Sequence, residues 1–327
     1  MPVIPITTAF EKISATVQDA SARRTSRRSA SQTQGRLIPR KVQFDWSQTP
    51  LEWIPGQPFA SHFINEINLL LPAGEFWFCK LYNKALPLVT DAKLREDVQM
   101  FVRQEAMHAR AHGGAIVEYL HAHGIETQSN TQQEDWLFEV LLADAPFGRT
   151  LPKWAERRWL VFRLGIIAAV EHMTCVLGKY VLENKSWDAL GADPVLLDLL
   201  RWHGAEEVEH RSVAFDLYRH LGGRYPSRYY LASIAMPVVY GLWVHGAAHL
   251  MKQDPRFAAK RPSVLRPWIW REWQRTASAG HLPSPWWLIR RELPFFSPWY
   301  DPVREASTEA ALAYLDASPA AARAAAA

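Results

Sequence analysis

The chain has 327 residues, of which 48% are hydrophobic and 21% are charged, so it is long enough to bury a large core. Residues 1–41 hold eight Lys or Arg and only two acidic residues, so the formal net charge of +4 originates in the N-terminus. A basic excess confined to one end excludes a nucleic-acid-binding face on the folded part, and we expect no nucleic-acid partner. Two cysteines exclude a disulfide scaffold and indicate a reducing compartment, which we take to be the cytoplasm.

The first segment, residues 1–44, is predicted to be a disordered basic tail. Its sequence "SARRTSRRSASQTQGR" is polar, rich in Ser and Arg and free of aromatic residues. It also lacks the apolar stretch of a secretory signal.

Residues 45–223 show the periodicity of an all-α bundle. We expect long helices over residues 59–86, 91–124, 152–184 and 193–222. Thr90 or Asp91 is expected to cap the second helix. Asp193-Pro194 forms an N-cap followed by proline, and Gly222-Gly223 supplies a stop. Pro72 is expected to kink or divide the first helix, and the polar stretch "GIETQSNTQQED" is expected to be a loop. Four long helices in sequence predict a four-helix bundle.

Residues 224–305 are predicted to form a helical, Trp-rich cover over that bundle. Residues 229–251 contain no Lys, Arg, Asp or Glu and are long enough to span a bilayer. They also contain Pro237 and two histidines, which hydrocarbon tolerates poorly, so we expect a helix buried in the protein.

The end of the chain combines a Trp-rich and an Ala-rich segment. Residues 261–300 hold six of the fifteen tryptophans, interleaved with Arg and Pro. This composition fits either a segment at a membrane interface or an arm packed over the bundle, and we expect the arm. Residues 306–327 are predicted to be a short helix followed by an Ala-rich tail.

Two of the four predicted helices carry the same Glu-x-x-His spacing. Glu105 and His108 lie in "QEAMHARAH", and Glu207 and His210 lie in "HGAEEVEH". At roughly 100° per residue, positions three apart share one face of a helix. Each pair therefore presents one carboxylate and one imidazole in the same direction.

One helix before each pair, a single glutamate interrupts an apolar run. Glu75 lies in "LLLPAGEFWFCKLY" and Glu171 lies in "LGIIAAVEHMTCVLG". A buried carboxylate needs a basic partner or a metal ion, and the run around Glu171 offers no Lys or Arg. Alternating lone Glu and Glu-x-x-His helices are the ligand pattern of ferritin-like di-iron carboxylate bundles.

His203 adds a third histidine, one turn before Glu207. It lies on the same stripe as Glu207 and His210, so we expect it to bind the ion that His210 holds. Glu206 and Glu209 fall to the side of this stripe, where they can meet water.

The chemistry of this donor set favours two iron ions as cofactor. Four carboxylates neutralise two divalent ions, and two of the carboxylates, Glu105 and Glu207, are expected to bridge them. Manganese or a mixed Mn/Fe pair suits the same donors.

The combination of four Glu and three His resembles the bacterial arylamine N-oxygenases. More broadly, "GEFWF", "RQEAMHARAH", "AAVEHMT" and "WHGAEEVEHRSVAFDLY" resemble a bacterial family of predicted metal-dependent hydrolases, over roughly residues 45–300. These resemblances imply a ferritin-like fold and a metal site made by Glu75, Glu105, His108, Glu171, His203, Glu207 and His210.

We therefore expect a di-iron enzyme that uses O₂ to hydroxylate, N-oxygenate or desaturate a small apolar or aromatic substrate, with an external electron donor. Two alternatives remain open: a binuclear metal-dependent hydrolase, as the family description suggests, and a non-catalytic iron-handling protein. Peripheral membrane contact and a homodimer also remain open.

Overall fold

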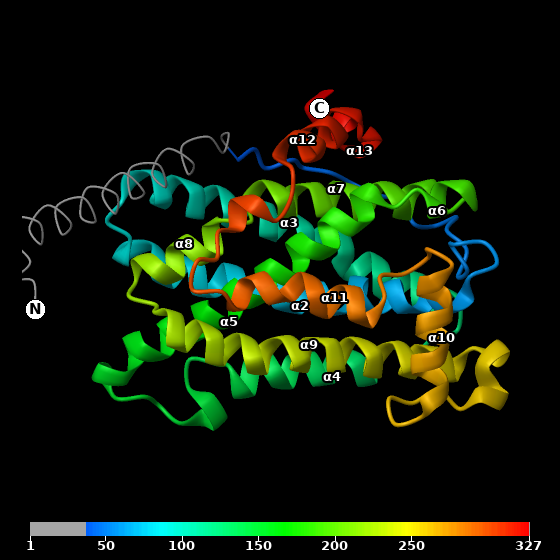
Figure 1. Ribbon diagram of the computed structural model, residues 1–327, viewed down its shortest axis with the longest axis horizontal. Helices are drawn as coiled ribbons and strands as arrows, with labels where there is room; N and C mark the ends of the chain where they lie inside the picture. The colour runs from blue at the N-terminus through cyan, green and yellow to red at the C-terminus, as the bar shows by residue number, and fades with distance from the viewer. Residues whose placement is uncertain (1–36, 327) are drawn as a thin grey trace, which may run out of the picture. The chain divides into compact units, whose positions relative to one another are not determined.

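The computed structural model describes residues 37–326, and it shows that these residues form helices joined by loops, without a strand. The all-α prediction is therefore confirmed (Figure 1). The long helices are α2 (Pro58–Ala85), α3 (Ala92–Ala122), α5 (Lys153–Glu183), α7 (Pro194–His210) and α9 (Tyr225–Gln253). The shorter α-helices are α4 (Gln128–Asp135), α6 (Ser186–Ala189), α8 (Val213–His220), α10 (Pro267–Ser278), α11 (Pro285–Glu292), α12 (Thr308–Ala317) and α13 (Pro319–Ala326). Single 3-10 or π turns are Leu86–Leu88, Trp136–Leu141, Pro146–Gly148, Pro255–Lys260, Leu293–Phe296 and Pro302–Arg304.

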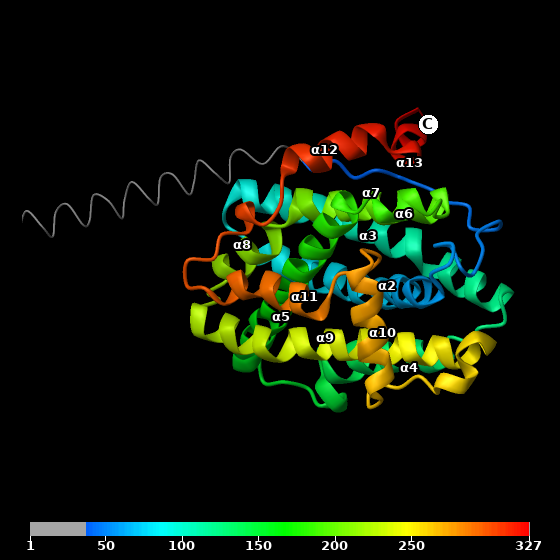
Figure 2. The same cartoon turned by 45° about the vertical axis from the view of Figure 1, so that its right-hand side comes forward.

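The helices that carry the predicted ligands pack in two pairs. α2 lies along α3, and α5 lies along α7. α9 packs against both α2 and α5 and so joins the predicted cover to the predicted bundle (Figures 1 and 2). α12 and α13 lie on α7, on the side away from α9.

Helix ends follow the predicted caps. The Asp91 carboxylate accepts a hydrogen bond from Leu94 N at 2.9 Å, which starts α3. The Asp193 carboxylate accepts from the backbone N–H groups of Val195 and Leu196, each at 3.0 Å, which starts α7. Pro72 lies within α2 and does not divide it.

The structure differs from the predicted elements at two places. The stretch predicted as a loop contains α4, because Asn130 is buried there and donates to the Glu66 carboxylate of α2 at 2.7 Å. The predicted fourth helix is broken between α7 and α8 at Arg211 and Ser212. The Arg211 side chain donates to the Val208 carbonyl, which would accept from Ser212 N in a continuous helix.

Both ends of the described chain are packed. Of the predicted basic tail, residues 1–36 lie outside the described residues, but residues 37–44 lie against the bundle with Leu37 and Val42 buried. In the Ala-rich end, α13 is fixed because Asp198 of α7 accepts from Ser318 Oγ at 2.7 Å and from Ala320 N at 3.0 Å.

Two helices, α5 and α9, are long and apolar enough to span a membrane by length and composition. Within the apolar window of each, 67% of α5 and 50% of α9 is buried inside the protein. This burial agrees with the expectation that residues 229–251 pack on the other helices, but half of the residues in the apolar window of α9 are exposed or only partly buried.

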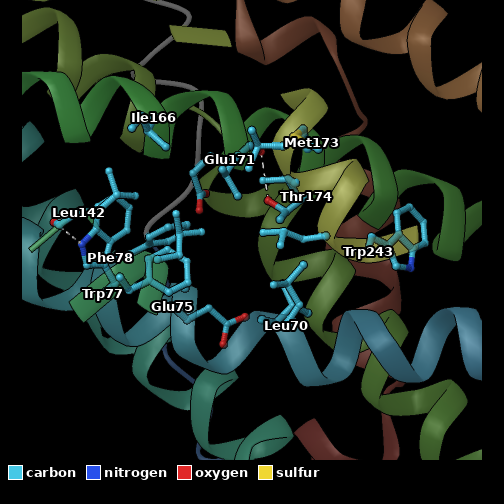
Figure 3. A pocket seen from close by; sticks show the side chains of 18 of the residues that line it. Leu70, Glu75, Trp77, Phe78, Leu142, Ile166, Glu171, Met173, Thr174 and Trp243 are labelled. Atoms are coloured by element: carbon cyan, nitrogen blue, oxygen red, sulfur yellow. Dashed lines mark hydrogen bonds between the residues drawn. The ribbon is translucent and has the colours of Figure 1, made fainter. Parts of the chain in front are cut away.

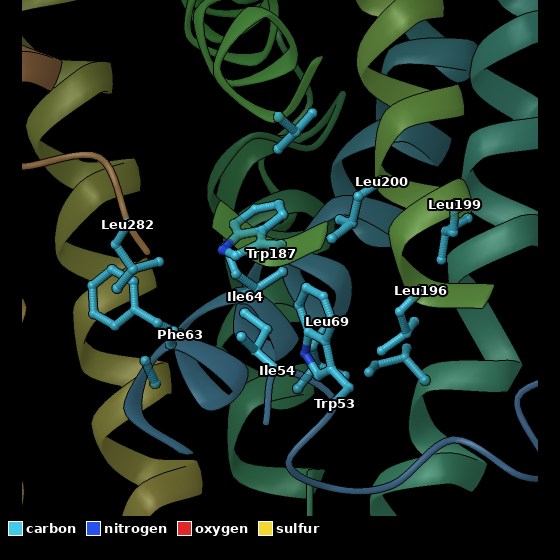
Figure 4. Packing of buried hydrophobic residues seen from close by; sticks show 14 of the residues in the cluster. Trp53, Ile54, Phe63, Ile64, Leu69, Trp187, Leu196, Leu199, Leu200 and Leu282 are labelled. Atoms are coloured by element: carbon cyan, nitrogen blue, oxygen red, sulfur yellow. The ribbon is translucent and has the colours of Figure 1, made fainter. Parts of the chain in front are cut away.

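A cluster of aromatic and aliphatic residues fixes the start of α7. Trp53 and Trp187 are fully buried, with ring centroids 5.7 Å apart, and lie next to Leu196 and Leu200 (Figure 4). The Trp53 carbonyl also accepts from Asp193 N at 2.8 Å. Packing and hydrogen bonding together position the helix that carries three of the predicted ligands.

The backbones of α5 and α7 touch at two glycines. A Cβ on Gly178 would lie 2.5 Å from the carbonyl oxygen of Gly204, and a Cβ on Gly204 would lie 2.8 Å from the Cα of Gly178. Glu171 is two turns before Gly178, and Glu207 is three residues after Gly204. The contact therefore sets how closely these two carboxylates approach each other.

We predict that Gly178→Ala destabilises the protein. Overpacking costs about 1–3 kcal/mol, and the better helix propensity of alanine offsets about 1 kcal/mol of it. The midpoint of urea unfolding measures the change. Gly241→Ala is the matched control, because Gly241 is exposed on α9 and a Cβ there meets nothing within 4 Å. The control should be neutral or stabilising, and equal midpoints for both variants would contradict the role of the glycine contact.

Candidate metal centre

The seven predicted ligands come together in the interior. Each of them is buried, and none is more than 5% exposed. They come from four helices: Glu75 from α2, Glu105 and His108 from α3, Glu171 from α5, and His203, Glu207 and His210 from α7.

Glu207 lies at the centre of this cluster, and its two carboxylate oxygens face different histidines. Its Oε1 is 2.8 Å from His203 Nε2 and 3.5 Å from His108 Nδ1, and its Oε2 is 3.2 Å from His210 Nε2. Glu105 has a similar place, since its Oε1 is 3.5 Å from both His108 Nδ1 and His210 Nε2. These two carboxylates are therefore the ones that can bridge two ions.

The other donors separate into two groups on either side of Glu105 and Glu207. On one side Glu75 joins His108 and His203, with Glu75 Oε1 3.6 Å from His203 Nε2. On the other side Glu171 joins His210, with Glu171 Oε2 3.5 Å from His210 Nε2. Donors bound about 2.1 Å from one ion lie about 3 to 4 Å from one another, so both spacings fit a metal ion.

Many of these atoms have no hydrogen-bond partner in the part of the chain that the structure describes. They are both carboxylate oxygens of Glu75, Glu105 and Glu171, Nδ1 of His108, and both ring nitrogens of His210. No Lys or Arg of residues 37–326 forms an ion pair with the four glutamates, whose neighbours are histidines. Buried anions without Lys or Arg partners are costly, and divalent cations would remove that cost.

The electrostatics show which carboxylates need a cation most. Burial, together with the nearby Glu105 carboxylate, raises the pKa of Glu75 well above its usual value. Burial and Glu207 do the same to the pKa of Glu171. Glu207 is the exception, because His210 and His203 outweigh burial and hold its pKa well below the usual range.

His203 lies on a different side from the one predicted. It was expected to share an ion with His210, but its ring stacks on His108 with centroids 4.1 Å apart and its Nε2 faces Glu75 and Glu207. The helical angle correctly places His203 beside Glu207, but it does not say which neighbouring helix faces that turn. α3 and α2 occupy this side, so His203 belongs with His108 and Glu75.

His112 holds His203 in this orientation. Its Nε2 is 2.7 Å from His203 Nδ1, and both rings are buried. Since Nδ1 of His203 is engaged by His112, Nε2 is the atom that points to the ligand cluster. Hydrogen bonds of this kind fix the tautomer and direction of a metal-binding imidazole.

A chain of contacts that the sequence did not reveal orients His108. His108 Nε2 donates to Glu206 at 3.1 Å, which leaves Nδ1 facing Glu105 and Glu207. Glu206 in turn accepts from Arg40 at 2.8 Å, and Arg40 also donates to Glu209 at 2.9 Å. The expectation that Glu206 and Glu209 meet water was wrong, because residues 37–44 cover this side of α7 and bury both carboxylates.

A cavity of about 320 Å³ adjoins the carboxylates. Glu75 and Glu171 point toward it from α2 and α5, and Phe78, Ile166 and Trp243 are among its walls (Figure 3). Its lining is otherwise almost entirely hydrocarbon and aromatic, with side chains from α2, α5, α9 and the turn Trp136–Leu141. The donor cluster therefore faces an apolar space large enough for a small organic molecule.

Three further polar side chains, one hydroxyl and two thiols, lie close to the donors. Thr174 lines the cavity, and its hydroxyl donates to Glu207 Oε2. Cys79 and Cys175 are both free thiols, as expected, and burial raises the pKa of Cys79 to about 12. Neither cysteine joins a donor group among the described residues.

Comparison with known proteins agrees with the geometry. The model of one protein family, described as predicted metal-dependent hydrolase, matches residues 38–306, which include all seven donors and every helix that borders the cavity. Comparisons with curated proteins and with solved structures give no match. The likeness to arylamine N-oxygenases therefore rests on the ligand pattern. With four-fifths of its length matched, the chain belongs to the family of predicted metal-dependent hydrolases.

Proposed function

We propose that the protein is a ferritin-like di-iron enzyme that uses O₂ to oxidise a small apolar molecule, with electrons from an external donor. The observation that carries this proposal is a cluster of seven buried Glu and His donors whose four glutamates line a cavity walled by hydrocarbon. A pair of iron ions would supply the activation of O₂. An apolar pocket supplies the affinity for an apolar substrate and excludes water.

Each residue has a distinct part in this proposal. Glu105 and Glu207 would bridge the ions, Glu75 and Glu171 would each complete one side, and His108, His203 and His210 would supply nitrogen. Thr174 donates to Glu207 at the edge of the cavity, so a hydroxyl lies between the donors and the substrate space. The surrounding aromatic and aliphatic groups would hold the substrate against the Glu75 and Glu171 carboxylates.

Metal-dependent hydrolysis is the second candidate, and the family description favours it. Two ions in this site would activate a water and polarise a carbonyl or phosphoryl group. The cavity lining, however, includes no Lys, Arg or His from residues 37–326 to bind an anionic group. Such a lining favours a neutral, apolar substrate, such as an ester or an amide.

Metal content gives the first test. Purified protein should hold about two iron ions per chain, and Glu105→Ala or Glu207→Ala should lose most of both, because each removes a bridge. Elemental analysis measures the change. Glu118→Ala, an exposed glutamate on the same helix as Glu105, is the matched control and should keep both ions. One zinc per chain that survives both bridge substitutions would rule out this site.

His203 gives a graded test of its side of the site. His112→Leu removes the hydrogen bond that orients His203 and should lower the affinity for one of the two ions about 10–100-fold. His203→Ala removes the donor itself and should weaken the same ion further, while the ion beside His210 stays bound. Stepwise titration with a chelator resolves the two ions. His245→Ala replaces an exposed histidine on α9 and should change the affinity for neither ion. If His203→Ala gave the same titration curve as the wild type, His203 would not be a ligand.

Dependence on O₂ separates oxidation from hydrolysis. Iron-loaded, reduced protein should consume O₂ faster when indole, aniline or a medium-chain alkane is added, and it should be inactive without O₂. Ile166→Trp fills the cavity away from the donors, so it should keep both irons and lose the stimulation. Anaerobic turnover of an apolar ester such as 4-nitrophenyl butyrate, lost in Glu105→Ala, would establish hydrolysis in place of oxidation.

A further inference from the structure

The cavity opens to the surface between α5 and α9. Three of its lining residues are also exposed large hydrophobics: Phe162 at 37%, Ile234 at 48% and Val238 at 44%. A molecule entering the cavity at this side therefore passes apolar side chains before it reaches the carboxylates.

The outer face of α9 beside this opening is uncharged. Tyr229, Tyr230, Ile234 and Val238 are exposed along it, and the segment from Tyr229 to Met251 contains no Lys, Arg, Asp or Glu. An exposed helix face of a soluble protein normally carries charged residues. The outer face of α9 therefore has the composition of a surface that binds a partner.

A groove next to the opening adds aromatic and basic side chains. It is lined by Trp154, Arg157, Arg158 and Tyr230, and it shares Phe162 with the cavity. Trp154 is 70% exposed, and the Arg158 guanidinium lies 5.5 Å from its ring centroid. Tyr and Trp beside Lys or Arg are typical of proteins that lie at a lipid headgroup layer.

Basic side chains gather at the start of α5, beside the groove. Arg149, Lys153, Arg157 and Arg158 are exposed around the first turns of α5, and Glu156 is the one acidic residue among positions 149–158. Lys153 lies in the first turn of α5, where a cation is unfavourable because the helix dipole is positive. An anionic partner would offset that cost.

We propose that this surface, which we call the mouth face (Trp154, Arg157, Arg158, Phe162, Tyr230, Ile234 and Val238), docks on a bilayer containing anionic phospholipid. The aromatic and aliphatic side chains would enter the headgroup layer, and the arginines would bind lipid phosphates. The cavity would then open toward the acyl chains. Delivery of an apolar substrate from the membrane rests on the proposed function, but the docking itself does not.

The charge of the mouth face distinguishes a bilayer from a second copy of the chain. In a symmetric dimer the same patch meets itself, which would bring the arginines of both copies together. An anionic lipid surface instead complements them. The same charge makes the contact sensitive to ionic strength.

Vesicle flotation of the full chain tests the proposal. Wild-type protein, with or without metal, should float with vesicles of equal parts phosphatidylcholine and phosphatidylglycerol at low salt, and not with phosphatidylcholine alone. Arg157→Gln combined with Arg158→Gln should lower the partition coefficient about 30-fold, which corresponds to about 1 kcal/mol for each cation. Tyr230→Ser combined with Ile234→Ser should also weaken binding, because it removes the inserted groups.

Two control pairs carry the same substitutions away from the mouth face. Arg103→Gln combined with Arg110→Gln removes two exposed arginines from α3. Ile38→Ser combined with Leu312→Ser removes two exposed hydrophobics from the side of α7 and α12. Both pairs should bind vesicles like the wild type.

Three results would overturn the proposal. The first is that the protein does not bind anionic vesicles at low salt. The second is that binding survives both mouth-face pairs and so arises elsewhere, the basic residues before residue 37 included. The third is that, without any lipid, the protein forms a stable dimer whose affinity falls in the mouth-face variants. Because flotation is read without turnover, a negative result leaves the metal and O₂ experiments to judge the proposed function separately.

Discussion

Four carboxylates buried without a lysine or arginine partner are the constraint on which the rest of this structure depends. Glu75, Glu105, Glu171 and Glu207 lie in the interior, and within residues 37–326 their charged neighbours are histidines. Such a cluster can persist only if cations neutralise it or if protons occupy it. The raised pKa values of Glu75 and Glu171 describe the second case, in which protons hold the places that metal ions would take.

The two sides of the site are supported unequally. On one side both imidazoles have an outer hydrogen bond, His108 to Glu206 and His203 to His112. On the other side His210 has no hydrogen bond at Nδ1 among the described residues, and its ring packs on Phe101 with centroids 4.5 Å apart. Outer hydrogen bonds raise ligand basicity and fix ring direction. Two ions in this site would therefore differ in affinity and in reactivity.

The sequence predicted which Glu and His side chains converge, because helical geometry ties spacing to direction. Two Glu-x-x-His pairs and two lone glutamates gave six of the seven side chains that meet in the interior, and the predicted caps at Thr90 or Asp91 and at Asp193 gave the helix starts. The sequence could not predict which segments pack against each helix in the folded protein. The side on which His203 lies depends on which helix faces that turn, and the burial of Glu206 depends on a segment more than 160 residues away. Likewise, α4 forms in a polar stretch because Asn130 is buried against Glu66.

Arg40, near the start of the described chain, contacts side chains that are made much later. Its partners, Glu206 and Glu209, lie 166 and 169 positions later, so this segment leaves the ribosome long before its binding site on α7 exists. Residues 37–44 can pack on α7 only after α7 has been made, so this segment acts as a latch on the helix that carries three of the donors. Any N-terminal truncation or fusion that displaces this latch would leave the helices in place while releasing the direction of one ligand.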